Sequence, residues 1–193
     1  MRALAAALVV ALVFVGAWER TAADTHVLRG VVRVNGRPTK DVVVWLARPG
    51  PMAPTTARVV LDQRNMAFIP RLLVVPVGTT VEMPNSDRVF HNVFSYHNGK
   101  RFDLGLYPAG TRKLVTFDQP GVSRVFCNIH PTMAAYVVAV ASSFYAVTDA
   151  EGRFAIAGVE GQRHEFSMWR AGAEPYSGTI AGDADQPVTV DWP

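Results

Sequence analysis

The stretch that decides the fold is residues 122–133, VSRVFCNIHPTM. Its first half alternates, so Ser123, Val125 and Cys127 share one face of an expected β-strand and point inward. Positions three apart on a strand face opposite sides, so a continuing strand could not bring the cysteine, histidine and methionine of this stretch around one point. The chain must therefore curl after Cys127, and Pro131, which has no backbone N–H for a sheet, supports ending the strand there.

The side chains of this loop form an unusual set of metal donors together with one residue upstream. Cys127 is the only cysteine of the chain, His130 and Met133 follow it, and His91 lies in the segment FHNV at 90–93. Thiolate and thioether suit Cu(I), and imidazole suits both oxidation states. Two histidines and one cysteine with a weak axial methionine make up the donor set of a mononuclear electron-transfer copper site. The sequence therefore predicts a site for moving electrons.

The Cys-x-x-His-x-x-Met loop after an alternating strand, with the earlier His-Asn-Val, resembles the cupredoxins, most closely those of the amicyanin and plastocyanin type. The resemblance covers about residues 58–140. It implies one type 1 copper held by His91, Cys127, His130 and Met133, and it implies that the Asn92 amide braces the ligand loop from outside the ligand set.

Each of these residues also has a structural interpretation. A lone cysteine is often a small buried hydrophobe, and a lone methionine is often core filler. His91 could be a hydrogen-bonded strand histidine, and Asn92 an ordinary turn or edge residue. The joint spacing favours copper over these alternatives. We expect His26 and His164 to be solvated, and His97 to lie at a surface turn too far along the strand from His91 to share its metal.

The N-terminus indicates export. Arg2 precedes an apolar run from Ala3 to Trp18, and the small residues of 21–23 follow, which is the layout of a secretory signal peptide over residues 1–23. An uncleaved membrane anchor is the alternative. An exported protein with one cysteine has no partner for an internal disulfide, which favours a reactive or metal-bound thiol. We expect the mature protein in the periplasm, with no membrane association.

Composition excludes one class of function and sets the fold class. The chain of 193 residues has a formal charge of +3, and loss of Arg2, Glu19 and Arg20 with the signal peptide would leave +2. That charge is too small to indicate nucleic-acid binding. Short runs of valine and aromatic residues interleave with polar residues, without long helical periodicity, which predicts an all-β protein.

Residues 58–141 contain enough short strands for a complete Greek-key cupredoxin sandwich. The expected strands are 58–61, 72–75, 79–83, 90–96, 113–117, 122–127 and 135–140. Both flanks are also organised as strands: 28–34 and 41–46 read as a hairpin, and 144–148, 153–156, 165–169 and 188–192 follow the copper segment.

The flanks resemble a carboxypeptidase-regulatory-like β-sandwich, with residues 145–154 similar to its Thr-Asp-x-x-Gly-x-Phe turn. We therefore expect a second small sandwich formed from both chain ends, 24–48 and 142–193, with the Pro-rich segment 49–57 as the entry linker. The alternative is two independent β-segments appended to the cupredoxin.

Three functions compete on this evidence. The leading one is a periplasmic electron carrier, not an enzyme, whose partner is a redox protein such as a dehydrogenase or cytochrome. The second is storage or delivery of copper without electron transfer. The third, a Cys-His hydrolase built on Cys127 and His130, lacks an orienting third residue and an oxyanion hole. For a carrier, Phe94, Ile129, Pro131 and Met133 are candidates for an apolar rim near His130, although Phe94 and Ile129 could equally be core residues.

Overall fold

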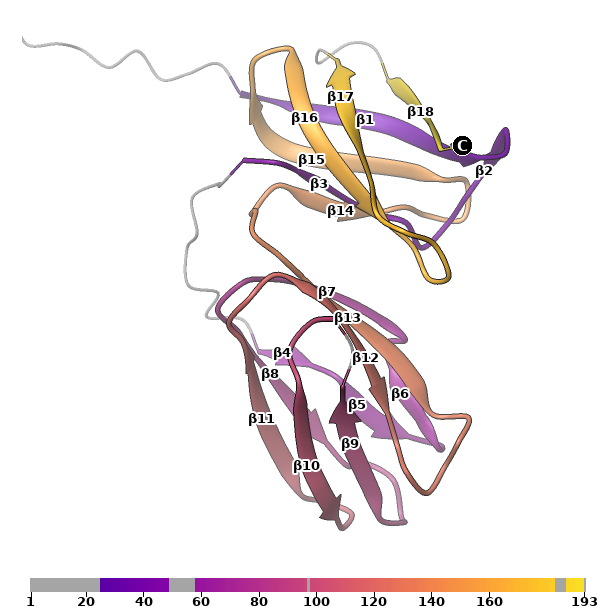
Figure 1. Ribbon diagram of the computed structural model, residues 1–193, viewed down its shortest axis with the longest axis vertical. Helices are drawn as coiled ribbons and strands as arrows, with labels where there is room; N and C mark the ends of the chain where they lie inside the picture. The colour runs from indigo at the N-terminus through magenta and orange to yellow at the C-terminus, as the bar shows by residue number, and fades with distance from the viewer. Residues whose placement is uncertain (1–24, 49–57, 97, 183–186, 193) are drawn as a thin grey trace, which may run out of the picture.

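The computed structural model describes residues 25–48, 58–96, 98–182 and 187–192. These residues form two β-sandwiches placed end to end (Figure 1). The chain begins in one sandwich, forms the whole of the other, and then returns to complete the one in which it began. The signal peptide expected at 1–23 and the linker expected at 49–57 lie outside the described residues, as does His97. None of the described segments is a helix with the length and apolar character needed to cross a membrane.

The lower sandwich in Figure 1 is built from one continuous stretch of chain, and we call it the site sandwich. Its larger sheet has the order β10-β9-β12-β13-β7, its second sheet the order β11-β8-β4, and β5 and β6 pair as a hairpin. The strands are β4 (Val59–Val60), β5 (Asp62–Arg64), β6 (Ala67–Ile69), β7 (Leu72–Pro76), β8 (Thr79–Pro84), β9 (His91–Ser95), β10 (Phe102–Tyr107), β11 (Arg112–Phe117), β12 (Gly121–Phe126) and β13 (Ala134–Val140).

The core of the site sandwich follows the alternation that the sequence predicted. Ser123 and Val125 on β12 are fully buried and Arg124 between them is exposed, so Cys127 continues the inward face. Val81 and Phe117 from the opposite sheet, and Leu61 between β4 and β5, complete this core with no exposed surface. A packed interior of this kind fixes the end of β12, from which the ligand loop leaves.

The upper sandwich is formed by both ends of the described chain, and we call it the flanking sandwich. One sheet has the order β15-β1-β18, with β2 also paired to β1, and the other has the order β14-β3-β16-β17. The strands are β1 (Thr25–Val34), β2 (Arg37–Pro38), β3 (Val43–Leu46), β14 (Tyr145–Val147), β15 (Arg153–Glu160), β16 (Arg163–Trp169), β17 (Tyr176–Ala181) and β18 (Val188–Trp192).

These pairings confirm the predicted fold class, an all-β protein with a second sandwich formed from both chain ends. β1 pairs antiparallel with β15, where Gly30 lies opposite Phe154, and parallel with β18, where Gly30 lies opposite Val188. The alternative of two independent appended segments is wrong, because the N-terminal strands have their sheet partners in the C-terminal flank. Strands β10 and β17 and the short strands β2, β5 and β6 were not among the expected strands.

The Thr-Asp-x-x-Gly-x-Phe turn joins the two halves of the flanking sandwich. Thr148 Oγ1 donates to the carbonyl of Thr39 at 2.8 Å and accepts from the N–H of Val42 at 2.9 Å. Gly152 has a φ of 73°, in the left-handed region that favours glycine, and a Cβ there would lie 2.6 Å from the Val32 carbonyl oxygen. The motif is therefore a clasp between segments that lie far apart in the sequence.

The two sandwiches meet through an apolar contact. Val138 and Val140 on the outer face of β13 pack with Val43 of β3 and Trp169 of β16, and all four are buried. The Trp169 ring meets the Tyr136 ring edge-on, with centroids 5.0 Å apart. Burial of large apolar side chains on both partners holds the sandwiches together.

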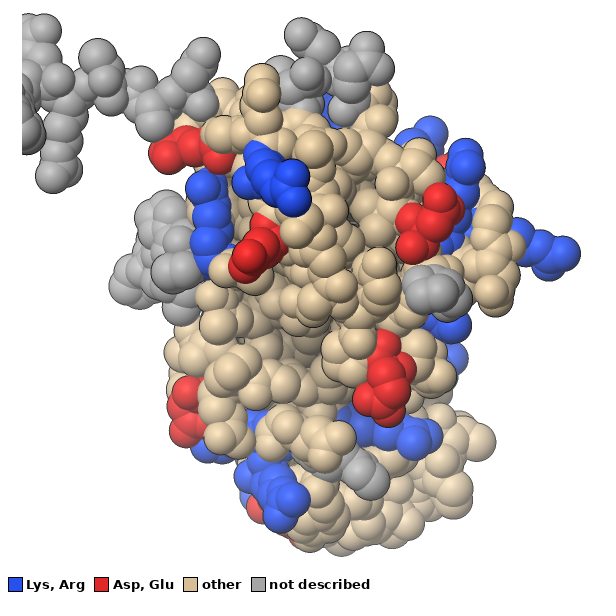
Figure 2. Space-filling model, turned by 45° about the horizontal axis from the view of Figure 1, so that its top comes forward, with Lys and Arg blue, Asp and Glu red and all other residues tan. Residues whose placement is uncertain are grey.

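Charges do not gather into one dominant region on the face shown in Figure 2, where basic and acidic side chains are interspersed. This distribution agrees with the small net charge of +3. It gives no support to a nucleic-acid interface on that face.

Candidate metal centre

Three of the four predicted ligands come together at one end of the site sandwich. His91 is the first residue of β9, Cys127 directly follows β12, and His130 lies in the turn before β13. One donor atom from each lies within 4.8 Å of the other two, and they are the metal-ligand group found among the described His, Cys, Asp and Glu residues. The chain curls after Cys127 as predicted, and the N–H of Met133 donates to the carbonyl of His130 at 2.9 Å to close the turn.

The three donor atoms form a compact triangle. His91 Nδ1 and His130 Nδ1 are 2.9 Å apart, and Cys127 Sγ is 3.9 Å from the first and 3.7 Å from the second. Atoms that bind one ion through bonds of about 2.0 to 2.3 Å must lie within roughly 4.3 Å of one another. The triangle fits a single metal ion.

The hydrogen bonding of His91 leaves one ring nitrogen for a metal. Its Nε2 lies 3.1 Å from Asp87 Oδ2, and the ring is fully buried. An ionised carboxylate can only accept a hydrogen bond, so Nε2 is the donor and Nδ1 is the ring nitrogen left to offer a lone pair to a metal. The N–H of Met66 and then the His91 ring hold the pKa of the Asp87 carboxyl below its ordinary value. Asp87 is a partner that the sequence analysis missed.

Asn92 lies where the predicted brace should lie. Its Oδ1 accepts from the N–H of Asn128 in the ligand loop at 3.3 Å, and its Nδ2 donates to Asp103 Oδ1 at 2.8 Å. The side chain is 4% exposed. Asp103 in turn accepts from the N–H of Gly105, which is the main reason that its pKa lies below the ordinary value. A carboxylate on β10 therefore orients the amide that holds the loop.

Met133 is buried in the same core cluster as Cys127, and it is 1% exposed. Its position immediately before β13 and its bond to His130 place it at the inner side of the ligand turn. This position suits the predicted axial ligand, and it suits core filler equally well. The role of the Met133 sulfur stays a prediction.

Tyr107 is a buried, uncharged residue next to the metal centre. It lies opposite His91 in the pairing of β10 with β9, and its hydroxyl donates to the Met83 carbonyl at 3.0 Å and accepts from Gln63 Nε2 at 2.5 Å. Burial raises the pKa of Tyr107 to about 12. The phenol is therefore neutral at physiological pH.

The structure corrects part of the predicted rim. Ile129 is 51% exposed and Pro131 is exposed, as a rim requires, whereas Met133 is buried. Phe94 is half-buried, with its ring stacked near those of Tyr96 and Phe126 on the sheet face. Met133 belongs to the core because its turn points back into the sandwich.

The prediction that His164 is solvated is wrong, because this residue is 5% exposed. His26 is half-buried, with its ring centroid 6.1 Å from that of His164. Burial, followed by the nearby Arg48, lowers the pKa of His164 and keeps the ring neutral. Both residues lie in the flanking sandwich, on β1 and β16, and neither joins the metal centre.

The centre confirms the resemblance to cupredoxins: two imidazoles and the single cysteine meet at the end of a β-sandwich beside a buried methionine. No protein-family model matches this chain, and no curated protein matches it.

Solved structures give three similarities to compare. The chain is 29% identical to a novel purple cupredoxin from Nitrosopumilus maritimus, covering 42% of this chain and 99% of that one, with a TM-score of 0.39. It is 26% identical to the Cu-containing nitrite reductase from Thermus scotoductus SA-01, covering 49% of this chain and 25% of the reductase, with a TM-score of 0.42. It is 24% identical to a reduced amicyanin mutant, covering 50% and 98%, with a TM-score of 0.40. Since each match covers half of this chain or less, the metal centre is assigned from its own residues.

Proposed function

We propose that this chain holds one copper ion at His91, Cys127, His130 and Met133, and that it transfers single electrons between redox partners without catalysing a reaction of its own. The observation that carries the proposal is the triangle of two imidazole nitrogens and one cysteine sulfur, with sides of 2.9 to 3.9 Å. A thiolate and imidazoles suit copper, whereas carboxylate and carbonyl sites suit magnesium or calcium. Bound copper would supply a one-electron couple between Cu(II) and Cu(I).

The residues around the triangle keep the ligands in place. Asp87 holds the His91 ring, Asn92 holds the loop at Asn128, and the backbone bond from Met133 to His130 holds the turn. Ligands with little freedom to move favour a site that changes oxidation state with little rearrangement. This rigidity favours retention of the metal and electron transfer over delivery.

Apolar side chains surround the side of the centre that solvent can reach. His130 is half-buried, and Ile129 beside it is 51% exposed. Phe90, next to His91, is 52% exposed, and Met66 is 55% exposed. Met66 lies beside the centre because its N–H donates to Asp87 Oδ2 at 2.7 Å. Exposed apolar patches mark interaction sites, and small redox encounters bury little surface. A redox protein, such as a dehydrogenase or cytochrome, would approach here.

The proposal includes export to the periplasm. It is supported by the signal-peptide layout of residues 1–23, and the single cysteine is compatible with an oxidising compartment because it has no partner for a disulfide within the chain. Edman sequencing of the protein recovered from a periplasmic extract should begin near residue 24.

The test of the site is the visible and electron-paramagnetic-resonance spectrum of the Cu(II)-loaded protein. We expect an intense thiolate-to-copper charge-transfer band that Cys127→Ser abolishes. His91→Ala should weaken copper binding, whereas His26→Ala, which changes a histidine of the flanking sandwich, should leave the band intact. A band that survives Cys127→Ser, or a metal-loaded wild type without the band, would contradict the assignment of Cys127 as a copper ligand.

The test of the function is retention of copper through redox cycles. We expect reversible voltammetry with unchanged copper content, and slow loss of copper to a chelator in both oxidation states. Irreversible voltammetry with rapid loss of Cu(I) would instead establish storage or delivery of copper, even with the ligands correctly assigned.

A further inference from the structure

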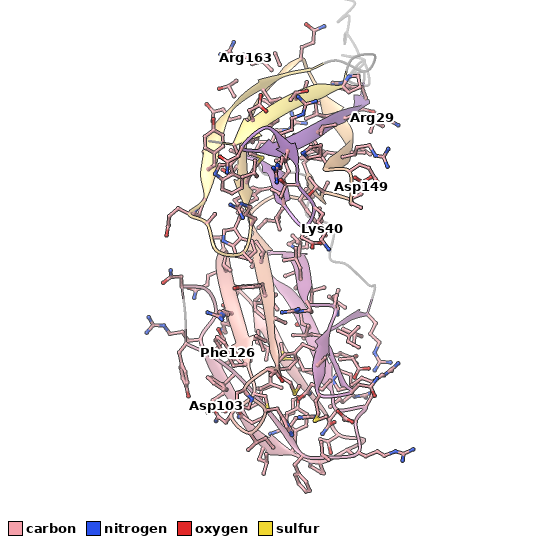
Figure 3. All side chains as sticks on the ribbon, turned by 90° about the vertical axis from the view of Figure 1, so that its right-hand side faces the viewer. Arg29, Lys40, Asp103, Phe126, Asp149 and Arg163 are labelled. Carbon is pink, nitrogen blue, oxygen red and sulfur yellow. The ribbon has the colours of Figure 1, made fainter. Side chains whose placement is uncertain are left out.

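A cleft lies between the two sandwiches, and none of the predicted copper ligands lines it. It has a volume of about 640 Å³ and is lined by residues of both sandwiches, including Lys40, Arg71, Arg124, Tyr136, Trp169 and Arg170. Figure 3 shows Lys40 at the end of the flanking sandwich that faces the site sandwich. A volume of this size and a position between two domains are typical of a small-molecule site.

The cleft carries an excess of positive charge that its one acidic residue offsets only in part. Four of the residues that line it are basic, whereas Asp41 is its only acidic residue, and that carboxylate lies 3.6 Å from Lys40 Nζ. Within the described parts of the chain, no Asp or Glu forms an ion pair with Arg71, Arg124 or Arg170. Unpaired guanidinium groups in a shared concave site attract an anion.

Two of the guanidinium groups are held against aromatic rings. Arg124 lies opposite Tyr136 in the pairing of β12 with β13, and its Cζ is 4.6 Å from the Phe126 ring centroid and 5.9 Å from that of Tyr136. Arg170 Cζ is 5.7 Å from the Trp192 ring centroid. A guanidinium held against a ring keeps N–H donors for carboxylate or phosphate oxygens and loses less freedom when it binds them.

Arg170 also carries a buried donor without an acceptor. Its Nε is shielded from solvent and has no hydrogen-bond partner among the described residues. A buried polar group of this kind is costly unless a ligand or water satisfies it. Tyr136 and Trp169, whose rings are in edge-on contact, also line this cleft, so part of its wall is aromatic.

We propose that this cleft binds a small organic anion that has a carboxylate or phosphate group on an aromatic or apolar body. The arginines bind the anionic group, and the Tyr136 and Trp169 side chains contact the body. Because none of these residues is a predicted copper ligand, the binding can be measured on metal-free protein, and its failure would leave the proposed electron transfer standing.

The experiment is calorimetric titration of the full mature chain with phenyl phosphate, benzoate and inorganic phosphate at low ionic strength. We expect saturable one-to-one binding of the two aryl anions, weaker binding of inorganic phosphate, and weakening with added salt. Arg124→Gln and Arg71→Gln should each weaken binding roughly tenfold, the effect of losing a charged hydrogen bond. Arg163→Gln is the matched control, since Figure 3 shows Arg163 at the far end of the flanking sandwich.

Four outcomes would overturn the proposal. They are no saturable binding of either aryl anion, equal weakening by Arg163→Gln and Arg124→Gln, inorganic phosphate binding as tightly as phenyl phosphate, and binding of a poly-glutamate peptide without binding of the aryl anions. The last result would assign the cleft to an acidic protein surface. Circular dichroism and melting temperatures of the variants distinguish lost binding from lost folding.

Discussion

At the scale of single residues, the centre depends on which imidazole nitrogen is available, and Asp87 decides this for His91. Asp87 Oδ2 accepts a hydrogen bond from His91 Nε2 at 3.1 Å, so Nδ1 faces the triangle. Groups that orient a metal-bound histidine typically contribute ten- to a hundredfold in metal affinity. Asp87→Ala should therefore weaken Cu(II) affinity by roughly that factor, as measured by competition with a chelator. Asp118→Ala is the control, because this exposed carboxylate pairs with Lys100 instead. Equal affinities in both variants would remove Asp87 from the site.

Met133 has two possible roles that one substitution separates. Leucine has a similar volume, so Met133→Leu should keep the fold within about 1.5 kcal/mol. If the sulfur is the weak axial ligand, the variant keeps copper but shows a shifted reduction potential and an altered visible spectrum. Voltammetry and absorption spectroscopy measure both. A variant identical to wild type in both measurements would make Met133 a core residue only.

The ligand loop could be predicted from the sequence because Cys127, His130 and Met133 lie within one short segment after an alternating strand. The contact between Asp87 and His91 could not be predicted, because it depends on how the loop before β9 folds, and this loop brings the carboxylate back to the ring. No pattern in the sequence distinguishes this acid from the exposed ones. The burial of His164 was missed for a similar reason, since a polar segment gave no sign that the ring turns inward.

At the scale of elements, the clasp of the flanking sandwich makes a sharp prediction at Gly152. Its φ is 73°, and an added Cβ would lie 2.6 Å from the Val32 carbonyl oxygen and 2.8 Å from the Thr39 nitrogen, both backbone atoms. Gly152→Ala should lower the free energy of unfolding by about 2 to 4 kcal/mol, measured by urea denaturation. Gly161→Ala is the matched control: its φ is 80° and no atom lies within 4 Å of the added Cβ. Equal losses would show that the backbone angle alone, rather than the crowding, sets the cost.

Asp149 gives the same turn a dependence on pH. Its Oδ1 accepts from the N–H groups of Glu151 and Arg153, and its Oδ2 accepts from the Arg153 guanidinium. The Arg153 N–H and then its side chain lower the pKa of the Asp149 carboxyl. A group with a lowered pKa stabilises the fold above its unfolded pKa, about 3.9, and this stabilisation is lost as the pH falls through the folded value. Asp149→Asn should therefore be less stable than wild type at pH 7, and the difference in melting temperature should shrink below about pH 4. A constant difference would contradict the role of the charge.

Five observed strands escaped prediction, and the two longest of them, β10 and β17, did so because their sequences contain residues that are rare in strands. β10 includes Asp103 and Gly105, and its pairing with β9 has a register shift between Asp103 and Leu106, with Gly105 at a φ of 64°. β17 includes Ser177 and Gly178, and Phe166 of β16 lies opposite that glycine. Alternation is broken at both places, and the strands form because their neighbours offer unpaired backbone groups.

At the scale of the whole molecule, Trp169 connects the two sandwiches. It is 6% exposed and packs with Val138, Val140 and Tyr136 of the site sandwich. Trp169→Ala should cost about 3 to 5 kcal/mol and should separate thermal unfolding into two calorimetric transitions. Trp192→Ala is the comparison, because Trp192 belongs to the core of the flanking sandwich alone. Identical unfolding profiles in the two variants would show that the contact does not couple the sandwiches.

The pairing of the two chain ends could be anticipated from the turn at 145–154. This turn resembles part of a complete β-sandwich, and the C-terminal flank alone does not contain all the strands of such a sandwich. The basic cleft could not be anticipated, because its residues come from six separate segments: 39–41, 70–72, 124, 134–136, 147 and 169–171. A site assembled from segments this far apart exists only after both sandwiches have closed.

The pairing of β1 with β18 also has a consequence for the order in which the protein folds. Gly30 lies beside Val188, so more than 150 residues are synthesised before the first strand can gain its parallel neighbour. The site sandwich is contiguous and can close earlier, which makes its formation the faster step. Until the last strand arrives, the N-terminal strand has unpaired backbone groups along its edge, which is the kind of surface that aggregates or recruits chaperones. The yield of soluble protein should therefore depend more on the C-terminal strand than on the copper ligands.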